Sequence, residues 1–355
     1  MRDGAPFAVA GRPAATRVRG SVSALRALAP ALRLVLLALL VAVALVASVG
    51  LGAAGIPLGS VVEALAGGGD ATTRVIVLEL RLPRAILAAL VGGTLALTGA
   101  IFQVLLRNPL AEPYILGVSS GAAVGTVSAI ALGWTALGPW ALPLAAFAGA
   151  VLSIALVFRL GYAVGRSLDT RVLLLAGVVL GAFFNAIIVL LLTSIDAETF
   201  RSALLWMMGS LARASWASVA VLAAYLLPAT LLLLALARPL DLLAAGEETA
   251  AYLGVQVDRL KWAAYLLASL AVAASVAVCG AIGFIGLIIP HALRLLWGSD
   301  HRFLLPASTL AGAAFLLVAD TVARTIVAPA ELPVGAVTAL VGVPVFVLLL
   351  TRRAQ

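Results

Sequence analysis

Charged residues and cysteines are scarce in this sequence. Asp, Glu, Lys and Arg together make up 11% of the 355 residues, whereas hydrophobic residues make up 64%. About a quarter of a typical soluble domain is charged, so the composition excludes an ordinary soluble protein and indicates an integral membrane protein. The one cysteine, Cys279, lies within an apolar run. A disulfide within the chain and a thiol metal site are therefore excluded, because each needs further cysteines.

The sequence also lacks the motifs of ATP hydrolysis and of common enzymes. It contains no G-x-x-x-x-G-K-[ST] or H-E-x-x-H pattern, and its single lysine, Lys261, lies outside any glycine-rich loop. If ATP drives this protein, another chain must hydrolyse it. We therefore expect no enzymatic activity and no cofactor bound by this chain.

Metal ligands and basic clusters are equally sparse. The two histidines, His291 and His301, are ten residues apart, and they are too few for a ligand-lined metal path through the membrane. We expect no metal site and interpret both histidines as polar groups at a membrane edge or a subunit contact. The net charge of +8 comes mostly from arginines scattered between apolar runs, which argues against a nucleic-acid partner.

Long apolar runs are abundant. A bilayer core about 30 Å thick requires about 20 apolar residues per helix, and this length predicts an all-α polytopic membrane protein with about ten transmembrane helices. The expected spans are residues 33–51, 84–106, 115–133, 140–160, 172–193, 216–237, 262–279, 281–297, 304–323 and 334–350. A single helix over 262–297 would be about 54 Å long, so we expect the chain to reverse at Gly280 and Gly283, where glycine tolerates the backbone angles of a turn.

The distribution of arginine predicts the orientation, since cytoplasmic loops carry an excess of basic residues. With the N-terminus inside, most basic residues fall on the cytoplasmic side, and both termini are cytoplasmic. Six are expected outside, namely Arg74, Arg81, Arg84, Arg201, Arg213 and Arg324. Residues 1–32 form a basic lead that we expect to be disordered, and residues 33–355 form the transmembrane domain. The first span is long and begins far from the N-terminus for a signal peptide, so we expect it to be retained.

An internal repeat links two parts of the chain. The segments GAIFQVLLRNPLAEPYILG, from residue 99, and GAIGFIGLIIPHALRLLWG, from residue 280, match without a gap at seven positions. The pairs are Gly99 with Gly280, Ala100 with Ala281, Ile101 with Ile282, Leu106 with Leu287, Pro109 with Pro290, Ala111 with Ala292 and Gly117 with Gly298. We predict two related halves, helices two to five and seven to ten, as in transporters whose pathway lies between repeats. We also expect Pro109 and Pro290 to end regular helices near the cytoplasmic face.

The longest polar connection is residues 238–261, RPLDLLAAGEETAAYLGVQVDRLK, between the sixth and seventh spans. It mixes leucines with acidic residues, which predicts one or two short amphipathic helices outside the bilayer. A solvated connection is the alternative. We favour a docking surface, because we expect the leucines to be exposed.

Several of these segments resemble the FecCD family of ABC importer permeases, which move ferric siderophores, haem and cobalamin. They are RLPRAILAALVGGTLALTGAIFQVLLRNPLAEPYILGVSSGAAVG, GEETAAYLGV, GAIGFIGLIIPHALRLLWGSDHR and ELPVGAVTALVGVPVF, in the family's order over about residues 70–355. The resemblance implies a ten-helix subunit in the bacterial cytoplasmic membrane, surrounded by lipid, that forms a homodimer with the pathway along its axis. It also implies two cytoplasmic ATPases that use ATP and Mg, one extracytoplasmic binding protein, and a metal chelate as substrate.

The resemblance further implies roles for particular residues. For ATPase coupling these are Glu247, Glu248, Leu253 and Gly254; for binding-protein docking, Arg81, Arg84 and Arg324; and for the cytoplasmic gate, Ser119, Ser120, Asp169 and Thr170. Arg213 follows WMMGSLA at the expected outer mouth and is a candidate for the substrate entrance. The outer arginines, Arg213 included, could instead be interfacial anchors.

The function we expect is therefore that of the membrane permease in an ATP-driven importer for an iron chelate or cobalamin. An ion-coupled secondary transporter is the main alternative, and it should carry buried ionisable residues on its spans. The only acidic residue in the expected spans is Asp320, which lies near an end, and Asn185 is polar but not ionisable. A structural subunit of a larger complex would leave the repeat and the docking-like loop unexplained.

Overall fold

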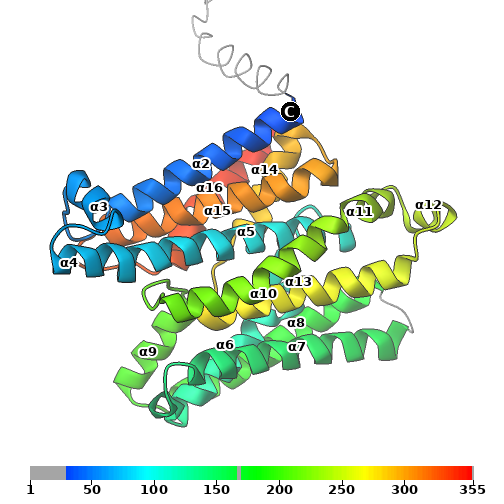
Figure 1. Ribbon diagram of the computed structural model, residues 1–355. Helices are drawn as coiled ribbons and strands as arrows, with labels where there is room; N and C mark the ends of the chain where they lie inside the picture. Colours follow the sequence, from blue (N-terminus) through cyan, green and yellow to red (C-terminus); the bar gives the residue numbers. More distant parts are fainter. Residues whose placement is uncertain (1–28, 166–168, 354–355) are drawn as a thin grey trace, which may run out of the picture.

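The computed structural model describes residues 29–165 and 169–353, and this part of the chain is helical without β-strands (Figure 1). Seven of its helices are long and apolar enough to cross a membrane, and three shorter ones are also apolar. The seven are α2 (Pro30–Gly50), the continuous helix of α4 (Ala71–Arg74), η1 (Val75–Arg81) and α5 (Leu82–Leu105), then α7 (Ala141–Gly165), α8 (Thr170–Thr193), α10 (Trp216–Ala235), α13 (Val257–Cys279) and α15 (His301–Thr325). The shorter three are α6 (Val118–Ala131), α14 (Ile285–Trp297) and α16 (Val334–Arg353). These ten helices match the ten predicted spans in order, so the all-α fold class is confirmed.

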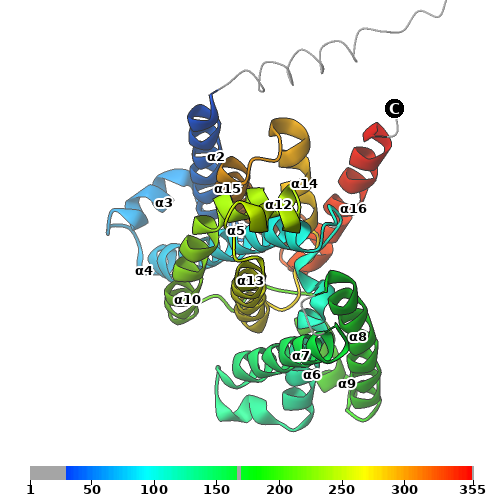
Figure 2. The same cartoon turned by 90° about the vertical axis from the view of Figure 1, so that its right-hand side faces the viewer.

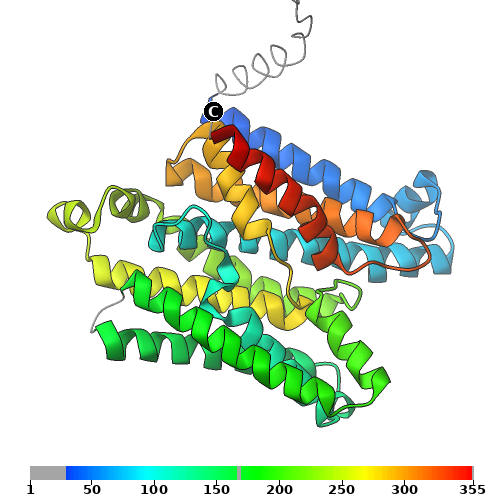
Figure 3. The same ribbon diagram turned by 180° about the vertical axis from the view of Figure 1, so that it is seen from behind.

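The ten helices alternate in direction between two ends of the bundle (Figures 1 and 3). At one end, which we call the α12 end, lie α11 (Ala237–Ala244) and α12 (Glu247–Tyr252) together with the start of α2 and the end of α16. At the opposite end, the α9 end, lie α3 (Leu58–Leu65), α4 and α9 (Ala197–Met207). The described chain thus begins and ends on the same side, as an even number of spans requires. The predicted lead lies outside the described residues, except for its last few, because α2 begins at Pro30.

The predicted halves are recognisable from helix lengths. Helices α5, α6, α7 and α8 have 24, 14, 25 and 24 residues, and α13, α14, α15 and α16 have 23, 13, 25 and 20. This series pairs α5 with α13, which runs the opposite way, so the halves are inverted relative to each other. The ungapped sequence match therefore has the wrong register, because it aligns the end of α5 with the segment before α14. Small residues recur wherever helices pack closely, which explains why the match looked regular.

The chain reverses between α13 and α14, as predicted, but not by a tight turn. Helix α13 ends at Cys279, Gly280 has φ +69°, and residues 280–284 then pass back into the bundle without helical structure before α14 begins (Figures 2 and 3). Helix α14 has 13 residues and is about 20 Å long. It therefore crosses only part of a bilayer, and residues 280–284 cover the remaining depth.

The expectation that Pro290 ends a helix is wrong. Pro290 lies inside α14, which continues to Trp297, whereas Pro109 lies in the turn after α5. A proline inside a helix leaves the carbonyl four residues earlier without its N–H partner. That carbonyl belongs to Gly286, and the Gln103 side-chain amide of α5 donates to it at 3.3 Å. The neighbouring helix thus supplies the bond that the proline removes, as membrane helices require.

Close packing of α5 on α15 forms the centre of the bundle. A Cβ atom added at Gly92 would lie 2.4 Å from the Gly312 carbonyl oxygen and 2.6 Å from Cβ of Leu316. The two backbones can approach this closely only because small residues face each other.

We predict that Gly92→Leu forces α5 and α15 apart and lowers the free energy of unfolding by about 1–3 kcal/mol or more, as overpacking does. Gly59→Leu is the matched control, since a Cβ at Gly59, exposed on α3, meets nothing within 4 Å. The measurement is thermal unfolding of the purified protein in detergent. Equal melting temperatures for the two variants would contradict this account of the contact.

Candidate functional site

Helix α11 anchors the polar connection to the bundle. Its apolar residues Ala237, Leu240 and Leu243 recur every third position, lie on one face and are buried, and the helix packs against α5 and α15. The predicted short amphipathic helices are thus present. The expectation that the leucines are exposed is wrong for α11, because its apolar face turns inward to the bundle rather than outward to a partner.

Helix α12 carries the exposed part of the connection (Figures 1 and 2). Glu248 is exposed, Leu253 is 61% exposed, and the exposed Gly254 has φ +87°, which favours glycine. Tyr252 is 91% exposed, and our sequence analysis missed it. The signal that could have found it was an aromatic residue on a short polar helix. Aromatic residues that are exposed in one protein often become buried anchors when a partner binds.

Glu247 differs from the other predicted coupling residues because it is bound within the chain. Its Oε1 accepts from Lys261 Nζ at 2.9 Å and lies 3.1 Å from an Arg107 guanidinium nitrogen. Lys261 is on α13, and Arg107 follows α5. Glu247 therefore holds α12 to the bundle, while Glu248, Tyr252, Leu253 and Gly254 form the free surface, which we call the α12 surface.

The predicted gate residues lie at two levels along α8. At the α12 end, Asp169 caps α8 by accepting from the Arg171 N–H at 2.7 Å, and the Thr170 hydroxyl donates to the Leu105 carbonyl at 3.2 Å. Ser119 and Ser120 are in the first turn of α6, and a Cβ added at Gly181 of α8 would lie 3.9 Å from Ser120 Oγ. Eleven helical residues separate Thr170 from Gly181, about 16 Å. Ser167 and Leu168 of the same loop lie outside the described residues.

A buried junction joins the two interrupted segments of the halves. The Tyr114 hydroxyl donates to the Ile282 carbonyl at 2.9 Å and accepts from the Ile282 N–H at 3.0 Å. Glu112 Oε1 accepts from the N–H of Phe284, which has φ +69°, at 2.6 Å. Our sequence analysis missed both residues. The signal was a glutamate next to a proline inside an otherwise apolar stretch.

The three arginines predicted to dock a partner converge at the α9 end. They border a cavity of about 230 Å³ together with Glu331. Arg81 is 4% exposed and donates to the carbonyls of Val49, Gly50 and Ala54 at 3.0, 2.9 and 2.5 Å. The Arg324 side chain, equally buried, donates to the carbonyl and hydroxyl oxygens of Ser48. Both therefore bind the C-terminal region of α2, where free carbonyls favour a cation.

Arg84 connects this cluster to α15. Its guanidinium lies 2.9 Å from Asp320 and 2.9 Å from Glu331, and Asp320 also lies 3.5 Å from Arg324. Asp320 lies near the end of α15, as expected, and it is fully buried. Its two arginine partners compensate the carboxylate charge, so this buried acid has a structural explanation.

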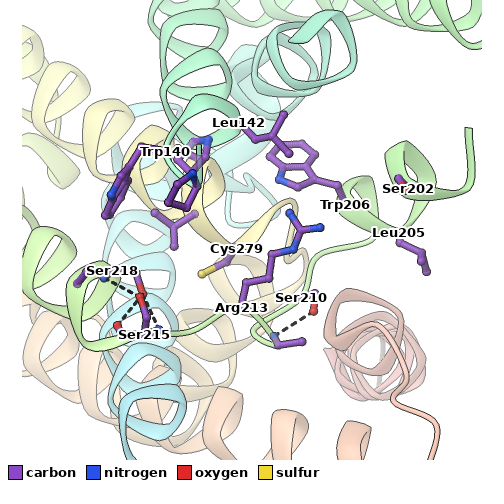
Figure 4. A pocket seen from close by; sticks show the side chains of 16 residues that line it. Trp140, Leu142, Ser202, Leu205, Trp206, Ser210, Arg213, Ser215, Ser218 and Cys279 are labelled. Atoms are coloured by element: carbon purple, nitrogen blue, oxygen red, sulfur yellow. Dashed lines mark hydrogen bonds between the residues drawn. The ribbon is translucent and has the colours of Figure 1, made fainter. Parts of the chain in front are cut away.

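A larger cavity, about 610 Å³, opens at the α9 end (Figure 4). Its walls come from the start of α7, from α9, from the α9–α10 loop, from the start of α10 and from the end of α13. The exposed Arg213 extends its guanidinium toward Trp206, and Cys279 lies beside it (Figure 4). Trp140 and four serines complete a mostly apolar wall with one cation. The residue predicted at the substrate entrance thus lies in a real cavity.

The two histidines are buried apart from each other. His291 is inside the bundle, with its ring 6.0 Å from that of Phe346. His301 begins α15, and its Nδ1 lies 2.5 Å from Asp241 of α11. In the described part of the chain, no group of three or more His, Cys, Asp or Glu side chains could hold a metal ion.

Comparison with known proteins decides the family. Residues 39–352 match the description of the FecCD transport family, which is most of the chain. The chain belongs to the FecCD transport family. It is therefore a membrane permease of the ABC type, and the resemblance seen in the motifs is confirmed.

Curated members of the FecCD family share more than two fifths of the residues. The hemin transport system permease protein HmuU of Yersinia pestis is 44% identical over 287 residues, covering 78% of this chain and 84% of that protein. The vitamin B12 import system permease protein BtuC of Salmonella typhi is 43% identical over 286 residues, covering 81% and 86%. The ABC transporter permease protein YvrB of Bacillus subtilis, whose function is uncharacterised, is 44% identical over 280 residues, covering 78% and 79%.

Solved structures agree with the FecCD fold. A transporter assigned to the metal-chelate type of ABC transporter, in an inward-facing conformation, has a TM-score of 0.80 at 35% identity over 90% of this chain and 98% of that chain. PsaBC from Streptococcus pneumoniae, in complex with a Fab, has a TM-score of 0.51 at 18% identity over 76% and 90%. The second likeness concerns the fold alone.

The buried and the partly exposed acidic residues that pair with these arginines should differ in their effect on stability. We predict that Asp320→Asn lowers the free energy of unfolding by about 3–5 kcal/mol, because it leaves buried arginines without their counter-charge. Glu331→Gln, in which the replaced carboxylate is partly exposed, should cost less than about 1 kcal/mol. Equilibrium unfolding in mixed micelles measures both. Equal losses would show that burial does not decide the strength of these ion pairs.

Proposed function

We propose that this chain is the membrane-spanning subunit of an ATP-driven importer for a metal chelate, namely a ferric siderophore, haem or cobalamin. The observation that carries the proposal is the α12 surface, an exposed docking face on a chain that has no ATPase motif of its own. The names of HmuU and BtuC and the metal-chelate class of the solved transporter support the choice of substrate.

In this proposal two copies of the chain form a homodimer with the pathway along its axis. Helix α8 supports this arrangement, because the predicted gate residues lie at its start and beside it, and because it exposes apolar side chains such as Leu175, Val179 and Phe183. Two cytoplasmic ATPases bind the α12 surfaces and hydrolyse ATP with Mg. Their binding shifts the inward-open and outward-open populations only as far as their affinities for the two states differ.

A binding protein delivers the chelate at the α9 end, which is the extracytoplasmic side in this proposal. The cavity bordered by Arg81, Arg84 and Arg324 offers a cationic surface to acidic residues of that protein. Because all three arginines have partners within the chain, we assign the docking role mainly to their summed field, which steers association and weakens with salt.

The charge distribution supports the proposed orientation. In this proposal the α12 end, which carries basic residues such as Arg107, Arg238 and Arg259, faces the cytoplasm of a bacterial cell, with both termini on that side. The protein is then a multi-pass protein of the cytoplasmic membrane.

Arg213 is our candidate for first contact with the chelate. Its guanidinium extends into a mostly apolar cavity of about 610 Å³, where it can make a charge-assisted hydrogen bond to a carboxylate such as a haem propionate. Few strong contacts suit a transporter, because the substrate must also leave.

The secondary-transporter alternative is not favoured. It needs an ionisable group that can bind and release a cation within a span. Asp320 is paired with Arg84 and Arg324, and the half-buried Glu112 accepts a backbone hydrogen bond, so both acids already have a partner.

Uptake into liposomes tests the proposal. The chain is reconstituted with its candidate ATPase and binding protein, and ferric siderophore, haem and cobalamin are offered in parallel. We expect ATP-dependent uptake of one ligand, only with all three components present. Uptake of all three ligands without ATPase or binding protein would contradict the proposed energy source.

Charge reversal on α12 tests the coupling surface. We predict that Glu248→Arg lowers uptake per ATP about tenfold, the effect of losing about 1.4 kcal/mol of productive contact, while hydrolysis continues. Glu63→Arg, an exposed glutamate on α3 at the opposite end, is the matched control and should leave ATPase coupling unchanged. Normal coupling in Glu248→Arg would remove α12 from the ATPase interface.

A further inference from the structure

Helix α11 is attached to the first residue of α15 through a single carboxylate oxygen. Asp241 Oδ1 accepts from the His301 backbone N–H at 2.8 Å, and it also lies 2.5 Å from His301 Nδ1. His301 is 2% exposed, so this contact is sealed from solvent on its side. The two residues are 60 positions apart in sequence, so the contact joins two separate helices rather than closing a local turn.

The contact completes the N-terminus of α15. The first N–H groups of a helix have no partner within it and need external acceptors. Asp300, the N-cap of α15, accepts from the Arg302 N–H at 3.0 Å, while the His301 N–H is taken by Asp241. An acidic residue is favoured at this end of a helix. Two carboxylates therefore cap α15, but only Asp241 belongs to another helix.

Asp241 lies close in sequence to the α12 surface. Helix α11 ends at Ala244, and α12 begins at Glu247 after two linking residues, of which Gly246 has φ +129°. The unit of α11 and α12 is thus held to the bundle by two polar contacts. Asp241 joins it to α15, and Glu247 joins it to Lys261 of α13 and to Arg107 after α5.

Helix α15 reaches from this contact to the opposite end of the bundle. It has 25 residues and is about 37 Å long. Near its far end are Asp320 and Arg324, which bind Arg84 of α5 and Ser48 of α2. One continuous helix therefore has the α11 contact at its start and the arginine cluster at its end (Figure 1).

We propose that Asp241 and His301 are positioning residues that couple movement of the α11–α12 unit to α15. Through that helix, ATP-driven displacement at the α12 surface and docking at the arginine cluster bias the same conformational change. The proposal rests on the proposed function, in which an ATPase binds the α12 surface and a binding protein binds the α9 end. Neither residue touches ATP or the chelate in this account.

The test compares Asp241→Ala, His301→Leu and the double variant in the reconstituted complex. Three quantities are measured: assembly with the ATPase, the factor by which loaded binding protein stimulates ATP hydrolysis, and uptake per ATP. We expect assembly to persist and stimulation to fall at least about fivefold in each single variant, the lower range of known coupling between sites. The double variant should lose no more than Asp241→Ala, because that variant already removes the side-chain contact that His301→Leu removes.

Asp300→Ala is the matched control. It removes the other carboxylate cap from the same end of α15 without touching α11, so a general loss of helix stability should appear equally there. We expect near-normal stimulation in this control. Asp241→Asn retains an oxygen that can accept from the His301 N–H, and it should recover part of the stimulation lost in Asp241→Ala.

Three results would overturn the inference: normal stimulation in Asp241→Ala, losses that add in the double variant, or an equal loss in Asp300→Ala. If Asp241→Ala does not assemble, Asp241→Asn and His301→Leu carry the same comparison. Failure of the unmodified chain to bind the ATPase or to take up any chelate would instead count against the proposed function. Normal uptake by the unmodified chain with unaffected variants would count against the coupling role alone.

Discussion

The Tyr114 hydroxyl and the Glu112 carboxylate satisfy backbone groups of Ile282 and Phe284 inside an apolar bundle. In hydrocarbon an unsatisfied backbone group costs several kcal/mol, so a non-helical segment is tolerated only where protein supplies its partners. Residues 280–284 depend on these hydrogen bonds. Helix α14 can begin partway through the membrane only because the hydrogen bonds satisfy the non-helical segment before it. The interrupted segment between α5 and α6 provides the partners, so the first half of the chain stabilises the break in the second.

The same constraint explains the distribution of charge. Arg81 and Arg324 bind carbonyl and hydroxyl oxygens near the C-terminal end of α2, and Asp320 compensates Arg84 and Arg324. A buried ion pair adds little net stability, but it specifies which groups must meet. These contacts therefore fix where α2, α5 and α15 meet at the α9 end. A cavity with cationic walls is left beside them as a consequence.

The helices were predictable because a bilayer demands about 20 apolar residues and the sequence supplies ten such runs. Features that depend on packing partners were not. Pro290 remains helical because Gln103, 187 residues away, bonds the freed carbonyl, and no local pattern reveals that contact. Leu240 and Leu243 turn toward α5 and α15, because an amphipathic helix next to a bundle buries its apolar face there. The predicted site residues in α12 are mostly exposed, whereas the outer arginines are engaged within the chain, which their spacing alone could not show.

Helix α12 has six residues, so in the proposed coupling role its effect on transport depends on how firmly it is held. A surface on a flexible connection would move with its partner and transmit little displacement. Here the buried Leu240 and Leu243 pack α11 against the bundle, Asp241 binds α11 to α15, and Glu247 binds α12 to α13. A docked partner therefore displaces helices rather than a loop. Because packed helices have discrete arrangements rather than continuous ones, a displacement at one end favours a change of packing along their whole length, which is what alternating access requires.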